Sequence, residues 1–467
     1  MNNLRRIHFM GIGGSGLSGV AVMAKKAGYE VDGCDIEKET PYLGKVKKAG
    51  IKIYYGHSPD HLKDTDLLVI SPSVVFQNSK HLEYKGAKEK KIVKPWDEFV
   101  GEYLLKGKKV ICIAGTHGKS TTTALSGLIF EAAGTEPNVL VGATVHEWGA
   151  NYRIGESDLF IIESDEFYDK FLSYGPQIII LNNIEFDHPD YFKDEKKLIE
   201  SFRKFVESLQ GDKILIINLD SSGIQNLFTL LGKKTQGLKV YGYTLKQNST
   251  FKVKNMVYGT ISKKEPEFTD FVVYSDSLHL DTSFRLKIMG DYNVSNSLGA
   301  IILAQLFNVK LETTREVLSN FDGIGRRLEL IGEKKKILIY DDYAHHPTAI
   351  KATISALRQR YPTKRIWAIV EPHSYSRTKA LLGSYKDVFD IADKVIVGPI
   401  FKARDIKKFG VDNTSIVKAT SHSDIRPIGN LDEITKLIKR EAEANDVVLV
   451  MGAGYSYMWA REILRNL

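Results

Sequence analysis

A phosphate-binding signature is the sequence feature that most constrains the fold. The apolar run at residues 111–114 leads into Gly-x-x-Gly-Lys-Ser, and a helix-compatible segment follows. A strand, a glycine-rich turn and a helix N-terminus in this order place backbone N–H groups and the helix dipole where they attract phosphate. The lysine can reach the β- and γ-phosphates, and the serine hydroxyl can ligate Mg²⁺. The predicted ATP-binding residues here are Gly115, Thr116, His117, Gly118, Lys119, Ser120 and Thr121.

A second glycine-rich loop, Gly11–Gly16, follows the apolar run Ile7–Met10 and precedes a helical pattern. It matches Gly-x-Gly-x-x-Gly, and Asp35 after the next strand can meet a ribose or base. Alone, this loop would indicate a nicotinamide or flavin site, or only a tight turn. The turn at 115–120 is two residues shorter than the general phosphate-loop pattern, so it could also be accidental. Together the two loops favour a nucleotide-diphosphate substrate at the first and ATP at the second, since a dehydrogenase needs no second loop.

Composition narrows the class of protein. The chain has 467 residues, is 43% hydrophobic and carries a net charge of +8 from 65 Lys and Arg against 57 Asp and Glu. No basic block is interleaved with aromatic residues, so we expect no nucleic-acid partner. We find no secretory apolar region and no run near the roughly 18 residues of a membrane helix, so we expect a cytoplasmic protein without a membrane span. Cys34 and Cys112 are expected to be buried free thiols.

Alternating apolar runs and helical patterns predict an α/β protein of three domains. Residues 1–106 should form a Rossmann-like domain with a parallel sheet. Residues 107–321 should form the central phosphate-loop domain, with a parallel sheet plus a small antiparallel sheet, because residues 250–289 alternate apolar and polar side chains. Residues 322–467 should form a second Rossmann-like domain. We expect a helix from about Asn293 to Phe307.

Acidic residues follow the next expected central strand, in the block Glu163–Glu166. A carboxylate at the carboxyl end of a strand beside a phosphate loop is a natural Mg²⁺ ligand, and Glu163 is the best candidate. His188 follows a further strand in the same way and could ligate a second metal ion or contact substrate. Solvated surface acids and a structural histidine are the alternatives.

Two further blocks follow strands in the third segment. Asp341–Pro347 contains adjacent histidines, which rarely face one metal, so nucleotide and substrate contacts are favoured over zinc. Glu371–Thr378 contains Arg377, whose guanidinium can clamp a carboxylate through two hydrogen bonds. Arg326 and Arg327 could neutralise phosphate charge, or could be a solvated pair.

Together these blocks resemble the Mur ligase family, the ATP-dependent amide-forming enzymes of peptidoglycan synthesis. The resemblance covers essentially the whole chain, and the order of the blocks is its specific part. The blocks are Gly11–Gly16, Gly115–Thr123, Glu163–Glu166, Asn183–His188, Gly290–Asn296, Arg326–Arg327, Asp341–Pro347 and His373–Thr378.

The resemblance implies domains for a UDP-sugar, for ATP and for an incoming amino acid. It is closest to the members that join L-alanine to UDP-N-acetylmuramate through an acyl phosphate, with Mg²⁺, as a monomer or homodimer. It implies Lys119, Glu163, His188 and Arg377 as catalytic residues, and Ser120, Glu163 and His188 as metal ligands. Further ATP contacts would be Asn293, Asn296, Arg326 and Asp342. UDP-sugar contacts would be Gly13, Gly14, Ser15, Gly16, Asp35, His57, Ser71 and Asn183, and amino-acid contacts would be His345, His373 and Arg377.

Several features leave alternatives open. The blocks at 166–168 and 181–188 lean towards the related ligase that recycles a murein tripeptide, whereas the block at 373–378 leans against it. Tyr292 stands where family members often carry histidine, and no lysine is identifiable as a carbamylated metal bridge. Outside the family, a Rossmann oxidoreductase and a non-catalytic UDP-sugar sensor are the competing classes. Lys119, Ser120 and Glu163 argue against the sensor, which has no need of them.

Overall fold

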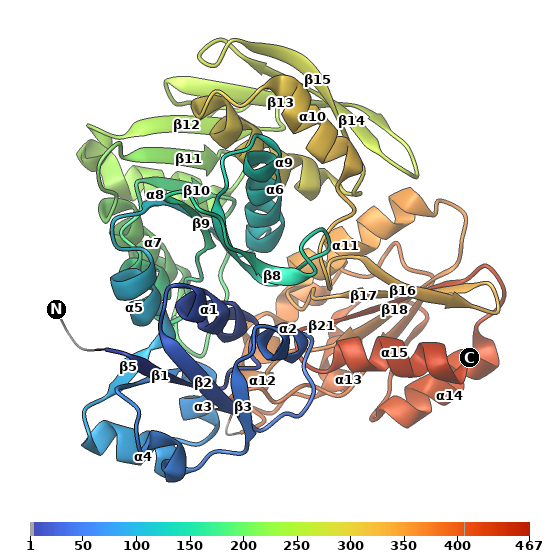
Figure 1. Ribbon diagram of the computed structural model, residues 1–467. Helices are drawn as coiled ribbons and strands as arrows, with labels where there is room; N and C mark the ends of the chain where they lie inside the picture. The colour runs from blue at the N-terminus through green and yellow to red at the C-terminus, as the bar shows by residue number, and fades with distance from the viewer. Residues whose placement is uncertain (1–3, 406) are drawn as a thin grey trace.

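Three β-sheets, one in each third of the chain, organise the protein. The computed structural model describes residues 4–405 and 407–467. Figure 1 shows an N-terminal lobe in blue, a middle lobe in green to yellow and a C-terminal lobe in orange to red, which meet around strand β8. The expected three-domain α/β fold is therefore confirmed.

The N-terminal sheet has five parallel strands in the order β3-β2-β1-β4-β5. Its strands are β1 (Arg6–Met10), β2 (Glu30–Asp35), β3 (Lys52–Tyr55), β4 (Leu67–Ile70) and β5 (Val93–Pro95). Its helices are α1 (Ser15–Lys26), α2 (Leu43–Lys48), η1 (Pro59–Leu62), α3 (Pro72–Gln77), α4 (Leu82–Glu89), α5 (Trp96–Phe99) and η2 (Val100–Leu104). The strand order reverses at β1, so the loop Gly11–Gly16 lies at the point where such sheets bind nucleotides.

The middle sheet has ten strands in the order β15-β14-β13-β12-β11-β10-β6-β9-β7-β8. Its strands are β6 (Lys109–Ala114), β7 (Asn138–Val145), β8 (Ala150–Arg153), β9 (Leu159–Glu163), β10 (Ile178–Leu181), β11 (Ile214–Asn218), β12 (Lys239–Thr244), β13 (Asn255–Lys264), β14 (Thr269–Ser275) and β15 (Leu280–Leu286). Its helices are α6 (Lys119–Ala132), η3 (Phe167–Ser173), α7 (Glu195–Glu207), α8 (Ser222–Leu231), η4 (Gly232–Thr235), α9 (Asp291–Leu306) and α10 (Leu311–Asn320). The expected antiparallel strands are present, and they extend the parallel sheet because β13 pairs in parallel with β12.

The C-terminal sheet has the order β16-β17-β21-β18-β19-β20, parallel except for the edge strand β16. Its strands are β16 (Glu329–Lys334), β17 (Ile337–Asp342), β18 (Ile366–Glu371), β19 (Lys394–Val397), β20 (Ile425–Pro427) and β21 (Val447–Gly452). Its helices are α11 (Pro347–Arg360), α12 (Tyr375–Ala380), η5 (Leu382–Tyr385), α13 (Asn413–Ala419), α14 (Leu431–Glu441) and α15 (Ser456–Asn466). Among the described residues, no helix combines the length and apolar character that crossing a membrane requires.

The first two domains share one hydrophobic core, whereas the third has its own. Phe9 and Phe99 of the N-terminal domain belong to the same buried cluster as Phe171 and Phe202 of the middle domain. The two clusters on the faces of the C-terminal sheet contain only residues from Leu328 onward. Apolar burial therefore joins the N-terminal and middle domains into one body, because it is the main stabilising contribution to such contacts. The C-terminal domain must be held in place by other contacts.

A substitution at Gly101 tests how closely the N-terminal and middle domains pack against each other. A Cβ added at Gly101, in η2, would lie 2.0 Å from the backbone oxygen of Ser173 in the middle domain. We expect Gly101→Ala to lower the free energy of unfolding by about 1–3 kcal/mol, since backbone must shift to relieve the overlap. The matched control is Gly86→Ala in α4, where the nearest atom lies at 3.6 Å and alanine favours the helix. Urea denaturation measures both variants, and equal unfolding midpoints would contradict the prediction.

Candidate active site

The phosphate loop adopts the conformation that its glycines permit. Strand β6 ends at Ala114, the loop turns through Gly115 with φ of +133° and Gly118 with φ of +81°, and α6 begins at Lys119. A Cβ at Gly118 would lie 2.2 Å from Oδ1 of Asn296 in α9. Both positive φ and this close approach require glycine. The loop therefore presents backbone N–H groups at the start of α6, as the sequence predicted.

Residues in the segment after β10 form hydrogen bonds with the phosphate loop. The N–H of His117 donates to Oδ1 of Asn183 at 2.8 Å, and Nδ2 of Asn183 donates to the oxygen of His117 at 3.1 Å. The hydroxyl of Thr116 donates to the oxygen of Glu185 at 2.9 Å. Asn183, which we expected to contact the UDP-sugar, thus engages both its amide atoms with the backbone of the phosphate loop.

Lys119 is held as a cation within the loop. Its Nζ donates to the oxygen of Gly115 at 2.6 Å and to Oε2 of Glu166 at 2.9 Å. Burial opposes the charge on Lys119, but the carboxylates of Glu166 and Asp165 outweigh it and raise the pKa of this lysine above its usual value. A positive charge is therefore retained where phosphate oxygens would bind.

Three potential metal ligands meet beside Lys119. Ligand atoms of Asp165, Glu166 and His188 lie within 4.8 Å of one another. Burial lowers the pKa of His188 more than its acidic neighbours raise it, so the ring is neutral and can offer a lone pair. Glu163 ends β9, and its Oε2 accepts the N–H of Gly142 at 2.6 Å. A mainly carboxylate set suits Mg²⁺.

The metal ligands predicted from the sequence were Ser120, Glu163 and His188. Ser120 is buried in the first turn of α6, with 3% of its surface exposed, and Glu163 lies on the neighbouring strand. The structure groups His188 instead with Asp165 and Glu166, which belong to the same acidic block but were not selected. Their position directly after a strand of the parallel sheet was the signal that could have identified them.

The middle and C-terminal domains meet through charged and polar contacts. Nε of Arg377 donates to Oδ1 of Asp187 at 2.6 Å, and these side chains are only 4% and 7% exposed. Nη1 of Arg377 lies 2.6 Å from Nδ1 of His373, and Nη2 lies 3.4 Å from Nδ1 of His188. The rings of His345 and His373 lie 5.3 Å apart. The predicted amino-acid residues His345, His373 and Arg377 are therefore gathered beside His188.

Burial keeps the histidines of this interface neutral. It lowers the pKa of His345 and of His373 well below the usual value, and the nearby charge of Arg377 lowers both further. Asp187 remains an anion because the guanidinium of Arg377 lowers the pKa of this carboxyl group despite its burial. Arg377 is thus a buried cation whose histidine neighbours are uncharged.

The remaining predicted ATP contacts form two groups. Asn293 and Asn296 are buried in α9, where Nδ2 of Asn296 donates to Oδ1 of Asn293 at 3.2 Å behind the phosphate loop. Arg326 and Asp342 lie in the C-terminal domain. Arg326 pairs with Asp341 at 3.2 Å, and Asp342 accepts the N–H groups of Leu328 and Ala344, each at 2.7 Å.

The predicted UDP-sugar residues do not all face the same loop. Asp35 accepts the N–H of Gly13 at 2.7 Å, and Ser71 lies at the N-terminus of α3, across the strand switch point. Gly14, Ser15 and Gly16 complete the turn into α1. Nδ1 of His57 instead lies 3.0 Å from Sγ of Cys34. His57 therefore points into a different cluster of side chains.

Tyr42 marks the junction of the three domains and was not selected from the sequence. Its hydroxyl donates to the oxygen of Gly142 at 3.5 Å. Desolvation raises the pKa of Tyr42 to about 12, with Arg326 and Glu163 close enough to influence it. Tyr42 lies in a loop between a strand and a short helix, and no sequence motif there marks it as a functional residue.

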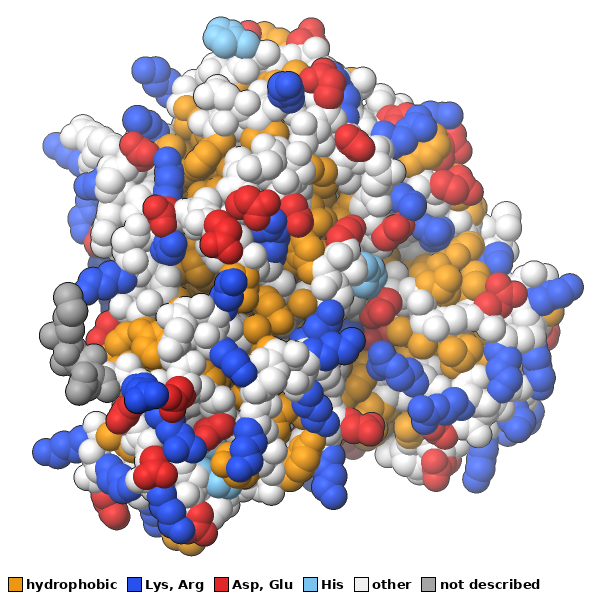
Figure 2. Space-filling model, in the orientation of Figure 1, with side chains coloured by type: hydrophobic (Ala, Val, Ile, Leu, Met, Phe, Trp, Pro, Cys, Tyr) orange, Lys and Arg blue, Asp and Glu red, His pale blue; other side chains and the backbone are white. Residues whose placement is uncertain are grey.

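Charge on the outer surface is mixed. On the face drawn in Figure 2, Lys and Arg side chains are interspersed with acidic ones on all three lobes. No broad basic surface is gathered on that face.

Comparisons with known proteins match the chain from end to end. The models described as Mur ligase family, catalytic domain; Mur ligase middle domain; and Mur ligase, glutamate ligase domain match residues 6–106, 113–304 and 326–454. The UDP-N-acetylmuramate–L-alanine ligase of Alkaliphilus metalliredigens is 34% identical over 99% of this chain and 98% of its own. That of Caldanaerobacter subterraneus is 34% identical over 100% and 98%.

Solved structures share the fold. The UDP-N-acetylmuramate–alanine ligase of Thermotoga maritima is 23% identical with a TM-score of 0.79, covering 98% of both chains. A murein peptide ligase from Psychrobacter arcticus is 25% identical with a TM-score of 0.73, covering 99% of this chain and 98% of its own. Three matched domains in order and relatives 34% identical along the full length lead to one conclusion: the chain belongs to the Mur ligase family.

Proposed function

We propose that this chain joins L-alanine to UDP-N-acetylmuramate at the expense of ATP, a step in making peptidoglycan precursors. The observation that carries the proposal is the convergence of Lys119, the acidic group with His188, and Arg377 at one domain junction. The full-length relatives at 34% identity bear the name of this activity. A reaction that uses ATP and a UDP-linked sugar suits the cytoplasm, the compartment expected from the sequence.

The chemical difficulty is the leaving group. A carboxylate does not react with an amine because hydroxide leaves poorly, so the carboxylate must first be activated. In our proposal, a carboxylate oxygen of UDP-N-acetylmuramate attacks the γ-phosphorus of ATP, and the bond to the ADP oxygen breaks. The amine nitrogen of L-alanine then attacks the acyl carbon, a proton is lost from nitrogen, and inorganic phosphate leaves with the bonding electrons.

Residues of the chain have distinct tasks in this scheme. Lys119, kept cationic by Glu166, stabilises charge on the transferring phosphoryl group. Asp165, Glu166, His188, Ser120 and Glu163 are the residues that would hold Mg²⁺. When bound, Mg²⁺ neutralises negative charge on phosphate oxygens. Asn293 and Asn296 line the loop, and Arg326 and Asp342 approach with the C-terminal domain.

Arg377 recognises the amino-acid carboxylate in this proposal, with His345 and His373 beside it. Its present partner Asp187 can instead receive the ammonium group of a bound amino acid, so a zwitterion would satisfy both side chains. The contact between Thr348 and Glu185 at 2.5 Å and that between Arg404 and Asp190 at 2.8 Å close the same interface. Closure excludes water, which would otherwise hydrolyse the acyl phosphate.

A product assay tests the proposed function directly. We expect phosphate release from ATP and UDP-N-acetylmuramate to depend on L-alanine, and the product mass to equal that of the amide. L-serine, glycine and murein tripeptide are measured in parallel. Release with the tripeptide and not with L-alanine would assign the recycling reaction instead. Tight UDP-sugar binding without phosphate release under any condition would favour the sensor.

Lys119→Ala tests the role of the phosphate loop. We expect a fall in kcat of at least about 1000-fold, because phosphoryl-group charge stabilisation is lost, with UDP-sugar affinity unchanged. Lys108→Ala is the control, since this lysine pairs with Asp158 on the surface. Steady-state rates and UDP-sugar titration provide the measurements. A normal rate for the Lys119 variant would remove the loop from the mechanism.

Arg377→Ala tests recognition of the amino acid. We expect the KM for L-alanine to rise about 10- to 100-fold, the value of a charge-assisted hydrogen-bonded pair, with little change in the KM for ATP. Arg404→Ala removes a neighbouring ion pair between the same domains and serves as the control. The double variant with Asp187→Asn avoids an unpaired buried carboxylate. Equal increases in both KM values would show that Arg377 only holds the domains together.

A further inference from the structure

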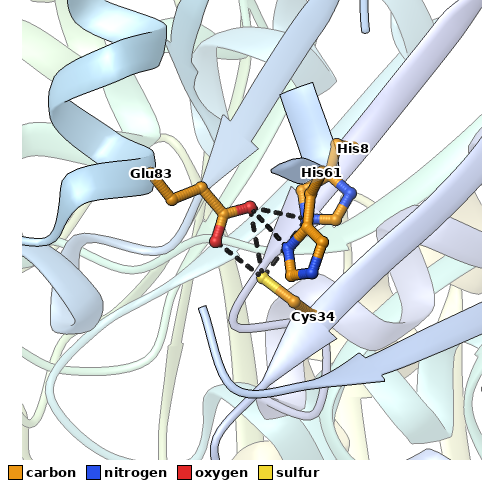
Figure 3. Close-up of side chains that lie close together, drawn as sticks. All are labelled: His8, Cys34, His61 and Glu83. Carbon is orange, nitrogen blue, oxygen red and sulfur yellow. Dashed lines mark hydrogen bonds and ion pairs between the residues drawn. The ribbon is translucent and has the colours of Figure 1, made fainter. Parts of the chain in front are cut away.

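A second group of chemically reactive side chains lies in the N-terminal domain, within the sheet and away from the phosphate loop of α6. Figure 3 shows His8, Cys34, His61 and Glu83 pointing toward one another. They come from β1, β2, η1 and α4. The stretch of sequence from His8 to Glu83 that contains all four residues is 76 residues long. His8, Cys34 and Glu83 are completely buried. None of the four is used in the proposed ligation reaction.

The four ligand atoms are spaced as the corners of a small polyhedron. Nε2 of His8 lies 2.9 Å from Oε1 of Glu83 and 3.2 Å from Sγ of Cys34. Nδ1 of His61 lies 3.1 Å from the same carboxylate, and Sγ lies 3.4 Å from its other oxygen. All four ligand atoms lie within 4.8 Å of one another. Tetrahedral Zn²⁺ with bonds of about 2.0–2.3 Å has ligand separations of about 3.3–3.7 Å, so small side-chain rotations reach that geometry.

Outer contacts orient two of the ligands as metal sites require. Nδ1 of His8 lies 2.5 Å from Oδ1 of Asp32, so a proton on Nδ1 leaves the lone pair of Nε2 facing the cluster. Asp32 is in turn paired with Arg6 at 3.3 Å. The backbone N–H of Ser58 donates to Oε2 of Glu83 at 3.0 Å, which leaves Oε1 directed inward. A carboxylate that holds the far nitrogen of a ligating histidine is a common arrangement around zinc.

Charge balance also favours a dication. One thiolate and one carboxylate neutralise Zn²⁺, while Asp32 is neutralised separately by Arg6. The alternative is an ion-pair network without a metal, in which a protonated His8 bridges Asp32 and Glu83.

We propose that His8, Cys34, His61 and Glu83 form a structural site for one Zn²⁺ ion in the N-terminal domain. Nitrogen, sulfur and oxygen ligands in a four-coordinate set favour zinc over Mg²⁺ or Ca²⁺. His61, with 11% of its side chain exposed, lies on the side from which the ion enters. The carbonyl of Cys34 accepts the N–H groups of Gly11 and Ile12 at 2.8 and 3.1 Å, so the ion would also brace the first glycine-rich loop.

Metal content of the purified full-length protein tests the site. After incubation with Zn²⁺ and gel filtration, we expect about one zinc per chain by mass spectrometry. Cys34→Ala and His61→Gln should each lower Zn²⁺ affinity by at least about 100-fold, because a ligand is lost. Asp32→Asn, which removes only the outer contact, should lower it about 10- to 100-fold. The matched control is Cys112→Ala, which removes the other buried cysteine and should retain the metal.

Cobalt provides a readout that identifies the sulfur ligand. Substitution with Co²⁺ should give a thiolate-to-cobalt charge-transfer band in wild type, Cys112→Ala and His188→Ala, but not in Cys34→Ala. His61 lies at the rim of the cluster, so His61→Gln carries the test if Cys34→Ala does not fold. Absence of stoichiometric metal in the wild type would overturn the proposal in favour of the ion-pair network. Equal metal content in wild type and both ligand variants would overturn it by placing the ion elsewhere.

Discussion

Parallel pairing of β6 with β9 and β10 is the constraint on which the candidate active site depends. In this register Ile113 lies opposite Glu163, and Ala114 lies opposite Leu181. The three strands therefore end at one level, and their following loops carry the phosphate loop, the acidic block and the block that ends at His188. Parallel sheets gather their loops at one edge in this way, and the chemistry follows from that gathering.

The nature of the domain contacts divides the molecule into two bodies. The N-terminal and middle domains share an apolar core, which is costly to separate because water would cover the exposed surface. The C-terminal domain meets the middle domain through pairs such as Asp187 with Arg377 and Asp190 with Arg404. The pair of Asp190 with Arg404 is partly exposed, so water can replace that contact at little cost, whereas separating the buried pair of Asp187 with Arg377 requires a ligand or water to take the place of each partner. A ligase that must admit three substrates needs one interface of this kind.

Much of the fold could be predicted from the sequence because buried parallel strands are short apolar runs. Runs such as Ile178–Leu181 and Leu67–Ile70 are strands at those positions. Strands β5, β7, β8, β12, β16 and β20 were not predicted. Of these, β5, β8, β16 and β20 are edge strands, whose partly exposed residues give no continuous apolar signal. The antiparallel strands were expected as a separate sheet, but whether β13 joins β12 depends on pairing across sequence, which alternation does not encode.

For the candidate site too, features marked by local sequence patterns could be predicted, and contacts between distant residues could not. The positions of Lys119, His188 and Arg377 after strands could be predicted, because local patterns mark a phosphate loop and polar residues that follow strands; their roles stay predictions. The position of Asn183 against His117, the grouping of Asp165 and Glu166 with His188, and the direction of His57 toward Cys34 could not. Each depends on a contact between side chains that are far apart in the sequence.

The sequence by itself determined the strand–loop–helix units, because glycine conformations, apolar runs and helix starts are local properties of the chain. Only the tertiary structure decided which carboxylates and histidines share a site, and that His8, Cys34, His61 and Glu83 meet. Register, domain packing and the burial of charge set those encounters, and all three arise from contacts between residues far apart in the chain.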